Sequence, residues 1–174
     1  MLLGVGGHAL DVGGELDLRL DLDQTVDPVR GVIGIHAPPL VIKNTVVVGA
    51  APSPAVQAHL RGFDVRTGKR KWIFHTIPKK GEFGYDTWLT AGQAEAAGAT
   101  GVWAPMSGDE ELGLIYAGVE LPAADQIGVT RQGNSLFSET LVALDAETGE
   151  RRWHYQLEHH GIWDRDVSSA AILF

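Results

Sequence analysis

Several features common in proteins are missing from this sequence of 174 residues. There is no cysteine, which excludes disulfide bonds and thiolate metal sites. No apolar run approaches the roughly 18 residues that a membrane-spanning helix requires. Basic residues are scarce, with 14 Lys and Arg against 22 Asp and Glu. The resulting net charge of -8 disfavours binding to nucleic acids and to anionic lipid surfaces, so we expect no nucleic-acid partner.

The N-terminal stretch MLLGVGGHALDVGG is apolar but contains no Lys or Arg. Because a secretory signal begins with basic residues, we do not interpret this stretch as one. Hydrophobic residues make up 44% of the chain, as in folded globular proteins, and the 22 glycines favour turns over long helices. The length is that of one ordinary domain, and we treat residues 1–174 as a single domain.

An internal repeat organises the chain. The stretch GFDVRTGKRKWIF at residues 62–74 is matched by ALDAETGERRWHY at residues 143–155. Asp64, Gly68 and Trp72 recur 81 residues later as Asp145, Gly149 and Trp153. Each copy predicts a β-hairpin, since Thr-Gly suits a tight turn and the flanking residues alternate between apolar and polar. The spacing is longer than one four-stranded unit of about 40–50 residues, so it spans either two units or one unit with a long insertion.

Other segments also predict strands. Residues 40–50 form two apolar runs around Lys43-Asn44, which is typical of a hairpin. Residues 111–119 predict a strand that follows the turn-like SGDE, and residues 101–107 are its candidate partner. Residues 91–99 are compatible with one short helical turn, limited by two glycines. Together these segments predict an all-β domain of strands linked by turns.

The repeated D-x-x-T-G-x-x-x-W pattern resembles the tryptophan-docking motif of the quinoprotein dehydrogenases, eight-bladed β-propellers that use pyrroloquinoline quinone. Residues 61–88, 102–116 and 141–166 are similar to stretches of the membrane-type glucose dehydrogenase branch. The likeness runs from roughly residue 13 to the end of the chain. It implies that residues 1–174 are a partial eight-bladed propeller of about three blades, and hence a fragment of a longer chain.

The resemblance implies a catalytic base and a support for the cofactor. Asp164 matches the aspartate of the family's W-D pair, which takes the hydroxyl proton of the substrate while hydride passes to the quinone. Trp103 matches the tryptophan beneath the quinone ring, where a planar cofactor needs a broad, rigid surface. The structural alternatives are a turn aspartate that caps a strand end and a tryptophan buried between blades.

The resemblance also implies a Ca²⁺ ion, with Asp164, Asp166 and Glu120 as candidate ligands. Ca²⁺ takes six to eight oxygen ligands, so others would have to come from the quinone. Relatives carry an acid in the loop that corresponds to residues 50–60, and this chain has none there. His36 occupies a position where many relatives have Ser or Thr bonded to the cofactor, and histidine can still donate a hydrogen bond.

The expected activity is oxidation of a sugar, polyol or alcohol, with electrons passing to ubiquinone or a cytochrome at a periplasmic or periplasm-facing location. A non-catalytic β-propeller scaffold with the same blade repeat is the alternative. We also expect this chain to be inactive by itself, since about five blades of an eight-bladed ring are missing and the open blade faces are exposed.

Overall fold

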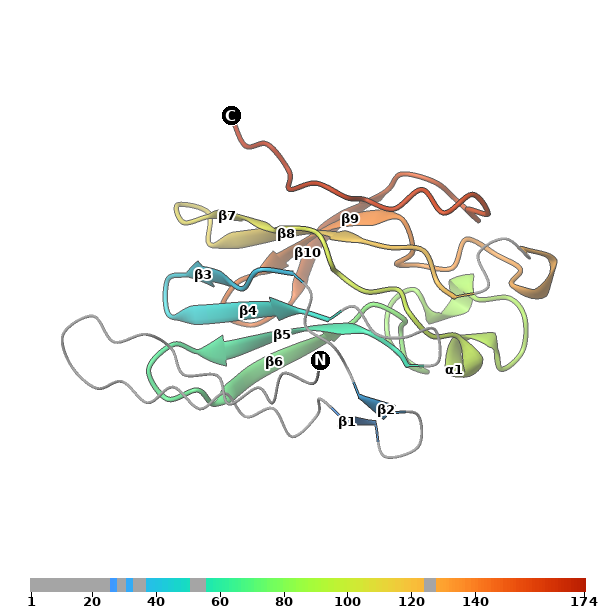
Figure 1. Cartoon of the computed structure of the whole chain (residues 1–174), viewed down its shortest axis with the longest axis horizontal. Coiled ribbons are helices and arrows are strands. Elements are labelled where there is room, and N and C mark those ends of the chain that lie inside the picture. Colours follow the sequence, from blue (N-terminus) through green and yellow to red (C-terminus); the bar gives the residue numbers. More distant parts are fainter. Residues whose placement is uncertain (1–25, 28–30, 33–36, 51–55, 124–127) are drawn as a thin grey trace, which may run out of the picture.

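The computed structural model describes residues 26–27, 31–32, 37–50, 56–123 and 128–174. These residues form two four-stranded antiparallel sheets, a two-stranded ribbon and short helical segments (Figure 1). The strands are β1 (Val26–Asp27), β2 (Gly31–Val32), β3 (Leu40–Ile42), β4 (Thr45–Gly49), β5 (His59–Asp64), β6 (Arg70–His75), β7 (Ser107–Asp109), β8 (Leu114–Val119), β9 (Thr140–Asp145) and β10 (Arg151–Gln156). The helical segments are η1 (Tyr85–Thr87), α1 (Gln93–Ala96) and η2 (Gly128–Thr130). The all-β prediction is confirmed, and no described helix is long and apolar enough to cross a membrane.

The first sheet has the strand order β3-β4-β5-β6, so each strand pairs with its neighbour in the sequence. The hairpin predicted at residues 40–50 is present, and Lys43 at its turn has a φ of 50°. The hairpin predicted at residues 62–74 is formed by β5 and β6. Its turn is fixed by Asp64, whose Oδ1 accepts hydrogen bonds from the backbone N–H groups of Arg66 (3.0 Å) and Thr67 (2.8 Å).

The second sheet has the order β10-β9-β8-β7, and β9 and β10 form the hairpin predicted at residues 143–155. One prediction was wrong here. The partner of β8 is not residues 101–107, because β7 begins at Ser107 and occupies most of the SGDE stretch that was predicted as a turn. The chain reverses later, at residues 110–113, because Gly113 supplies a φ of 68° and Asp109 Oδ1 accepts a hydrogen bond from Leu112 N at 2.9 Å.

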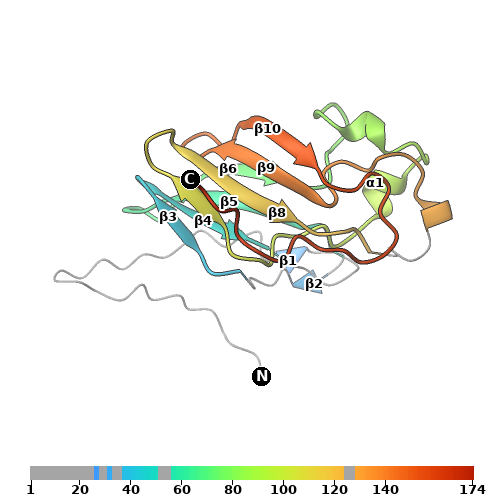
Figure 2. The ribbon, with the colours of Figure 1, turned by 90° about the horizontal axis from the view of Figure 1, so that it is seen from above.

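The two sheets pack face to face, with β3 of the first beside β7 of the second (Figure 2). Trp72 of β6 is 7% exposed and lies over the turn between β9 and β10. Its Nε1 donates a hydrogen bond to Ala146 O at 3.0 Å, and its ring covers Gly149. The shared core contains residues from both sheets, including Val47 and Leu60 from the first. A large aromatic side chain therefore joins one repeat to the next.

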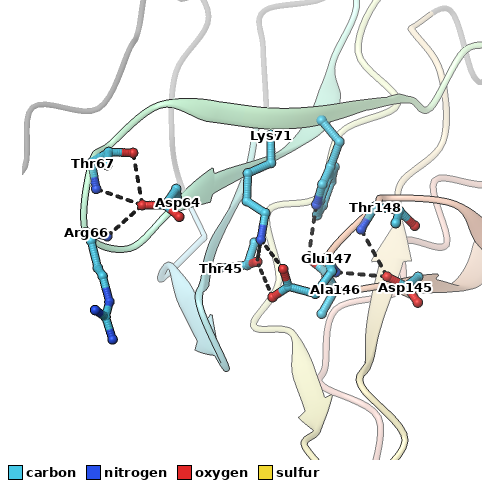
Figure 3. A network of polar contacts seen from close by, with 10 residues as sticks. Thr45, Asp64, Arg66, Thr67, Lys71, Asp145, Ala146, Glu147 and Thr148 are labelled. Carbon is cyan, nitrogen blue, oxygen red and sulfur yellow. Dashed lines mark hydrogen bonds and ion pairs between the residues drawn. The ribbon is translucent and has the colours of Figure 1, made fainter.

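A polar network also crosses between the sheets (Figure 3). Lys71 Nζ forms an ion pair with Glu147 and donates a hydrogen bond to Thr45 Oγ1 at 2.9 Å. Thr45 Oγ1 in turn donates to Glu147 Oε1 at 3.1 Å. Lys71 and Thr45 belong to the first sheet and Glu147 to the turn of the second, so this network links the two sheets beside Trp72.

The 81-residue repeat corresponds to one sheet plus a long connection. Each sheet holds one copy of the hairpin, and residues 76–106 join β6 to β7. This connection contains η1 and α1, the latter confirming the short helical turn predicted at residues 91–99. Trp88 anchors it, since the side chain is buried and its Nε1 donates to Leu136 O at 2.6 Å. Of the two explanations of the spacing, the unit with an insertion holds.

Candidate functional site

Two motifs that lie far apart in the sequence meet through a hydrogen bond between side chains. Trp103 Nε1 donates to Asp166 Oδ2 at 3.1 Å, across 63 positions of sequence. Trp103 stands at the end of the long connection, where the preceding Val102 donates its N–H to Ala50 O at 2.9 Å. Asp166 lies in the C-terminal segment, which runs along the second sheet (Figure 1). The bond fixes one end of a half-buried indole ring.

Glu120 lies next to this contact, immediately after β8. Its Oε1 accepts a hydrogen bond from Gly101 N at 2.7 Å, and its own N–H donates to Gly101 O at 2.9 Å. The next residue, Leu121, donates its N–H to Asp166 Oδ1 at 3.1 Å. Burial and, to a smaller extent, the negative charges of Asp166 and Asp164 raise the pKa of Glu120 to about 7, although the Gly101 hydrogen bond acts in the opposite direction. The three predicted carboxylates are therefore electrostatically coupled.

Asp164 is exposed and precedes Asp166 in the segment HHGIWDRD. The backbone of this segment is unusual, since His160 and Asp164 have positive φ angles of 57° and 53°. Asp tolerates this left-handed conformation better than most residues, although it remains uncommon. His160 Nδ1 lies 3.0 Å from Gly133 O, which ties the start of the segment to the loop before β9.

Two buried charged residues beneath this segment were not singled out from the sequence. Glu139 is 1% exposed and its carboxylate packs against Gly161, while Arg131 Nη2 donates to Gly161 O at 2.5 Å. Glu139 O accepts a hydrogen bond from Leu157 N at 2.8 Å. Burial raises the pKa of Glu139 to about 7. The signal that could have found this residue is an acid placed between the apolar stretch around Phe137 and strand β9.

The geometry of these residues can be compared with what a quinone and a Ca²⁺ ion, the two groups implied by the resemblance, would need. A half-buried indole held at its Nε1 offers the fixed flat surface that a planar cofactor needs, so Trp103 fits a quinone. The carboxylates fit a cation less well, because Asp166 and Glu120 already accept hydrogen bonds from Trp103, Leu121 and Gly101. Among the described residues no group of three or more His, Asp or Glu could hold a metal ion. His36, the remaining predicted contact, lies outside the described residues.

Comparison with known proteins gives a consistent family. Residues 8–174 match the PQQ family model, which is described as the beta-propeller domain of glucose/ethanol/alcohol dehydrogenase. The chain is 32% identical over 178 residues to the glycerol dehydrogenase large subunit of Gluconobacter thailandicus, covering 92% of this chain and 22% of that protein. It is 31% identical over 163 residues to a quinoprotein glucose dehydrogenase of Gluconobacter oxydans, covering 90% and 19%.

Solved structures agree with this assignment. The quinohemoprotein alcohol dehydrogenase of Comamonas testosteroni matches with a TM-score of 0.72 at 29% identity, over 80% of this chain and 23% of that one. A europium-containing methanol dehydrogenase matches with a TM-score of 0.67 at 26% identity, over 76% and 26%. The chain therefore spans about a fifth of the length of the curated relatives it matches. These neighbours identify the two packed sheets as part of a β-propeller.

Proposed function

Because this chain belongs to the PQQ-dependent glucose/ethanol/alcohol dehydrogenase β-propeller family, we propose that it contributes part of the quinone site of a dehydrogenase that oxidises a sugar, polyol or alcohol. The observation that carries the proposal is the hydrogen bond from Trp103 Nε1 to Asp166 Oδ2. It brings the motif predicted to support the cofactor and the motif predicted to carry the base to one place.

In this proposal each residue has a distinct role. Trp103 supports one face of the quinone, and Asp166 holds the indole ring in position. Pyrroloquinoline quinone, when bound, supplies the acceptor for the hydride equivalent that leaves the substrate carbon. Asp164 accepts the proton of the substrate hydroxyl, for which an exposed carboxylate is suited at neutral pH.

Asp164, Asp166 and Glu120 are the carboxylates that the chain offers to a Ca²⁺ ion. The charges of Asp166 and Asp164 add to the effect of burial in raising the pKa of Glu120, and a nearby cation would offset this repulsion. Since three of their oxygen atoms accept hydrogen bonds from the protein, these carboxylates cannot supply all six to eight oxygen ligands, and the cofactor would contribute others.

We propose further that the chain works as one portion of a longer propeller and is inactive by itself, at a periplasmic or periplasm-facing location, with a quinone or cytochrome as electron acceptor. The exposure of Trp153 supports the proposal that this chain forms only part of a propeller. It occupies the position equivalent to Trp72, yet it is 42% exposed where Trp72 is 7%. A quinone acceptor is supported by the relative from Acinetobacter baylyi that is named quinate/shikimate dehydrogenase (quinone).

The test uses a hybrid in which this chain replaces the matching segment of the Gluconobacter thailandicus glycerol dehydrogenase large subunit. Binding of pyrroloquinoline quinone is measured by equilibrium dialysis. Trp103→Ala is expected to weaken binding about 10-fold, since an aromatic stacking contact contributes on the order of 1 kcal/mol beyond buried area. Phe83→Ala, at an exposed aromatic residue in the connection between β6 and β7, is the matched control and should leave binding unchanged. Equal binding by both variants would exclude Trp103 as the support.

A further inference from the structure

Two buried charged side chains have no hydrogen-bond partner for their charged groups in the described part of the chain. Arg61 of β5 lacks an acceptor for its guanidinium nitrogens, although the Phe63 ring lies 5.8 Å from its guanidinium carbon. Glu139, just before β9, lacks a donor for both carboxyl oxygens. An unpaired buried polar group costs stability, so each one calls for an explanation other than stability. Of the two, Glu139 lies against the candidate functional site.

The carboxyl group of Glu139 faces Gly161, in the segment that carries Asp164 and Asp166. A Cβ atom at Gly161 would collide with this carboxyl group, and the three atoms nearest to that position all belong to Glu139. Glu139 is 1% exposed, so its side chain has little room to move aside in the close-packed interior. The contact therefore requires a glycine at position 161 and fixes how closely the segment approaches the protein beneath it.

The loop that ends at Glu139 also holds this segment by hydrogen bonds. Leu157 N donates to Glu139 O at 2.8 Å, and Arg131 Nη2 donates to Gly161 O at 2.5 Å. Glu139 has a φ of 45°, an uncommon conformation for this residue type that persists only where the surroundings fix it. Residues 131–139 therefore form the support on which the start of the segment lies.

The segment is held again beyond Asp164. Asp166 accepts hydrogen bonds from Trp103 Nε1 and from Leu121 N, both at 3.1 Å. Asp164 itself is exposed and lies between the two held positions, three residues after Gly161. A displacement of Gly161 would therefore shift one of the two supports of the predicted base.

The surroundings of Glu139 favour its neutral form. Burial and, to a smaller extent, the charges of Glu158 and Asp166 raise the pKa of Glu139 to about 7. Two cations, Arg131 and Arg165, act in the opposite direction. A protonated carboxyl group tolerates burial without a partner better than a carboxylate does. The shape of the side chain is therefore the property that the contact with the segment uses.

We propose that Glu139 is a positioning residue, whose buried carboxyl group supports Gly161 and so holds Asp164 where it can accept the proton of the substrate. This role rests on the proposed function, because it acts through the proposed base. It requires no contact between Glu139 and the substrate or the cofactor. Removing the support should therefore lower turnover without changing the binding of either.

The support of the segment is measured on the chain itself by hydrogen–deuterium exchange. Glu139→Ala leaves space beneath Gly161 and should speed amide exchange at residues 157–161 on the order of 10-fold, because local opening becomes easier there, while exchange in β8 stays the same. Glu111→Ala, at an exposed acid in the turn after β7, is the control and should alter neither. Unchanged exchange at residues 157–161 in Glu139→Ala would overturn the proposal.

The effect on the base is measured by a double-mutant cycle on kcat in the hybrid dehydrogenase. In the wild-type background Glu139→Ala is expected to lower kcat about 10-fold, since misplacing a reacting group by about 1 Å can cost about 100-fold. KM and the affinity for pyrroloquinoline quinone should not change. In the Asp164→Asn background the same substitution should lower kcat less than about 2-fold, because no base is left to position. A purely structural role would give the same factor in both backgrounds and would overturn the proposal.

Two further variants cover the case in which Glu139→Ala does not fold. Glu139→Gln keeps the shape of the side chain and should retain the turnover of the wild type, so a large loss of kcat with unchanged folding would overturn the proposal. Gly161→Ala disturbs the same contact from the other side and takes the place of Glu139→Ala in the cycle. Failure of the proposed function has a different signature. Asp164→Asn would then leave kcat unchanged, which would remove the base and this proposal with it.

Discussion

The two sheets carry nearly the same hairpin, yet their tryptophans lie in different surroundings. Trp72 of the first sheet is buried, donates to Ala146 O at 3.0 Å and covers Gly149. Trp153 of the second sheet is 42% exposed, and its ring packs against Tyr116 at a centroid distance of 5.8 Å. The difference shows that the hairpin is encoded locally, whereas the burial of its tryptophan depends on a following sheet that presents a turn to it.

The residues opposite the two tryptophans differ as well. Trp72 pairs with Gly62, and a Cβ atom on Gly62 would collide with the indole ring. Trp153 pairs with Ala143, which already carries that atom. The first hairpin is therefore shaped to let its tryptophan lie flat on the strand, and the second is not.

The largest expected difference between the two sheets is the loss of stability when each tryptophan is removed. Trp72→Ala is expected to lower the free energy of unfolding by about 3–5 kcal/mol, the usual cost of deleting a buried aromatic side chain. Trp153→Ala, at the equivalent exposed position, should cost no more than about 1 kcal/mol. Urea unfolding followed by circular dichroism measures both. Similar losses for the two variants would mean that the Trp72 contact does not join the sheets.

The glycine beneath Trp72 should show the next largest effect. Gly149 has a φ of 72°, and a Cβ atom there would lie 2.5 Å from Trp72 Cδ2. Gly149→Ala is expected to cost about 2–4 kcal/mol, the sum of left-handed strain and overpacking. Gly92 is the matched control because it has the same φ of 72° with nothing within 4 Å of the added atom. Gly92→Ala should cost only about 1 kcal/mol, and an equal cost at both sites would refute the packing contribution.

The two sheets are also expected to differ in how the aspartates of their turns make stability depend on pH. The ion pair with Arg152, reinforced by the N–H groups of Thr148 and Glu147, lowers the pKa of Asp145 to about 2. Because the folded-state pKa lies below the unfolded value, the stabilisation is present above about pH 4 and is lost as pH falls towards 2. The melting temperatures of wild type and Asp145→Asn should differ above pH 4 and converge near pH 2.

Asp64 gives the control for that titration. Its pKa is also lowered, chiefly by the Thr67 N–H and hydroxyl, and no arginine pairs with it among the described residues. Salt screens exposed charges, so added NaCl should reduce the effect of Asp145→Asn more than that of Asp64→Asn. The same salt dependence in both variants would contradict the role assigned to Arg152.

The smallest expected effect concerns the ion pair between the sheets. Lys71 and Glu147 are both partly exposed, so a double-mutant cycle with Lys71→Met and Glu147→Gln should give a coupling of about 0.2–1 kcal/mol. Arg152 stands at the position equivalent to Lys71 but pairs with Asp145 of its own turn. A double-mutant cycle on Arg152 and Asp145 measures an interaction within one hairpin. A larger coupling energy there would therefore say nothing about the contact between the sheets.

Local signals made the hairpins predictable from the sequence. A Thr-Gly turn with an aspartate four residues before the glycine specifies its own hydrogen bonds, as Asp64 and Asp145 both show. The strand β7 was misplaced because its three residues, Ser107–Asp109, are polar and lack the alternation of a buried strand. Its pairing is decided by β8 and by the turn at Gly113 rather than by its own composition.

The site was predictable only in part, for a related reason. Family resemblance identified Trp103 and Asp166 as candidates, but the bond between them spans 63 positions and depends on how the C-terminal segment crosses the second sheet. The local signal for the buried charges of Arg61 and Glu139 was weak, because burial follows from packing between distant segments. Their unsatisfied atoms became informative only in three dimensions.

The most direct test of the quinone site is dye-linked oxidation by the hybrid dehydrogenase, loaded with pyrroloquinoline quinone and Ca²⁺. Asp164→Asn keeps the size of the side chain and removes its basicity, so it should lower kcat at least about 100-fold while leaving cofactor binding intact. The control Asp86→Asn, an exposed aspartate of η1, should retain full activity. Unchanged turnover in Asp164→Asn would contradict the assignment of the base and, with it, the proposed function.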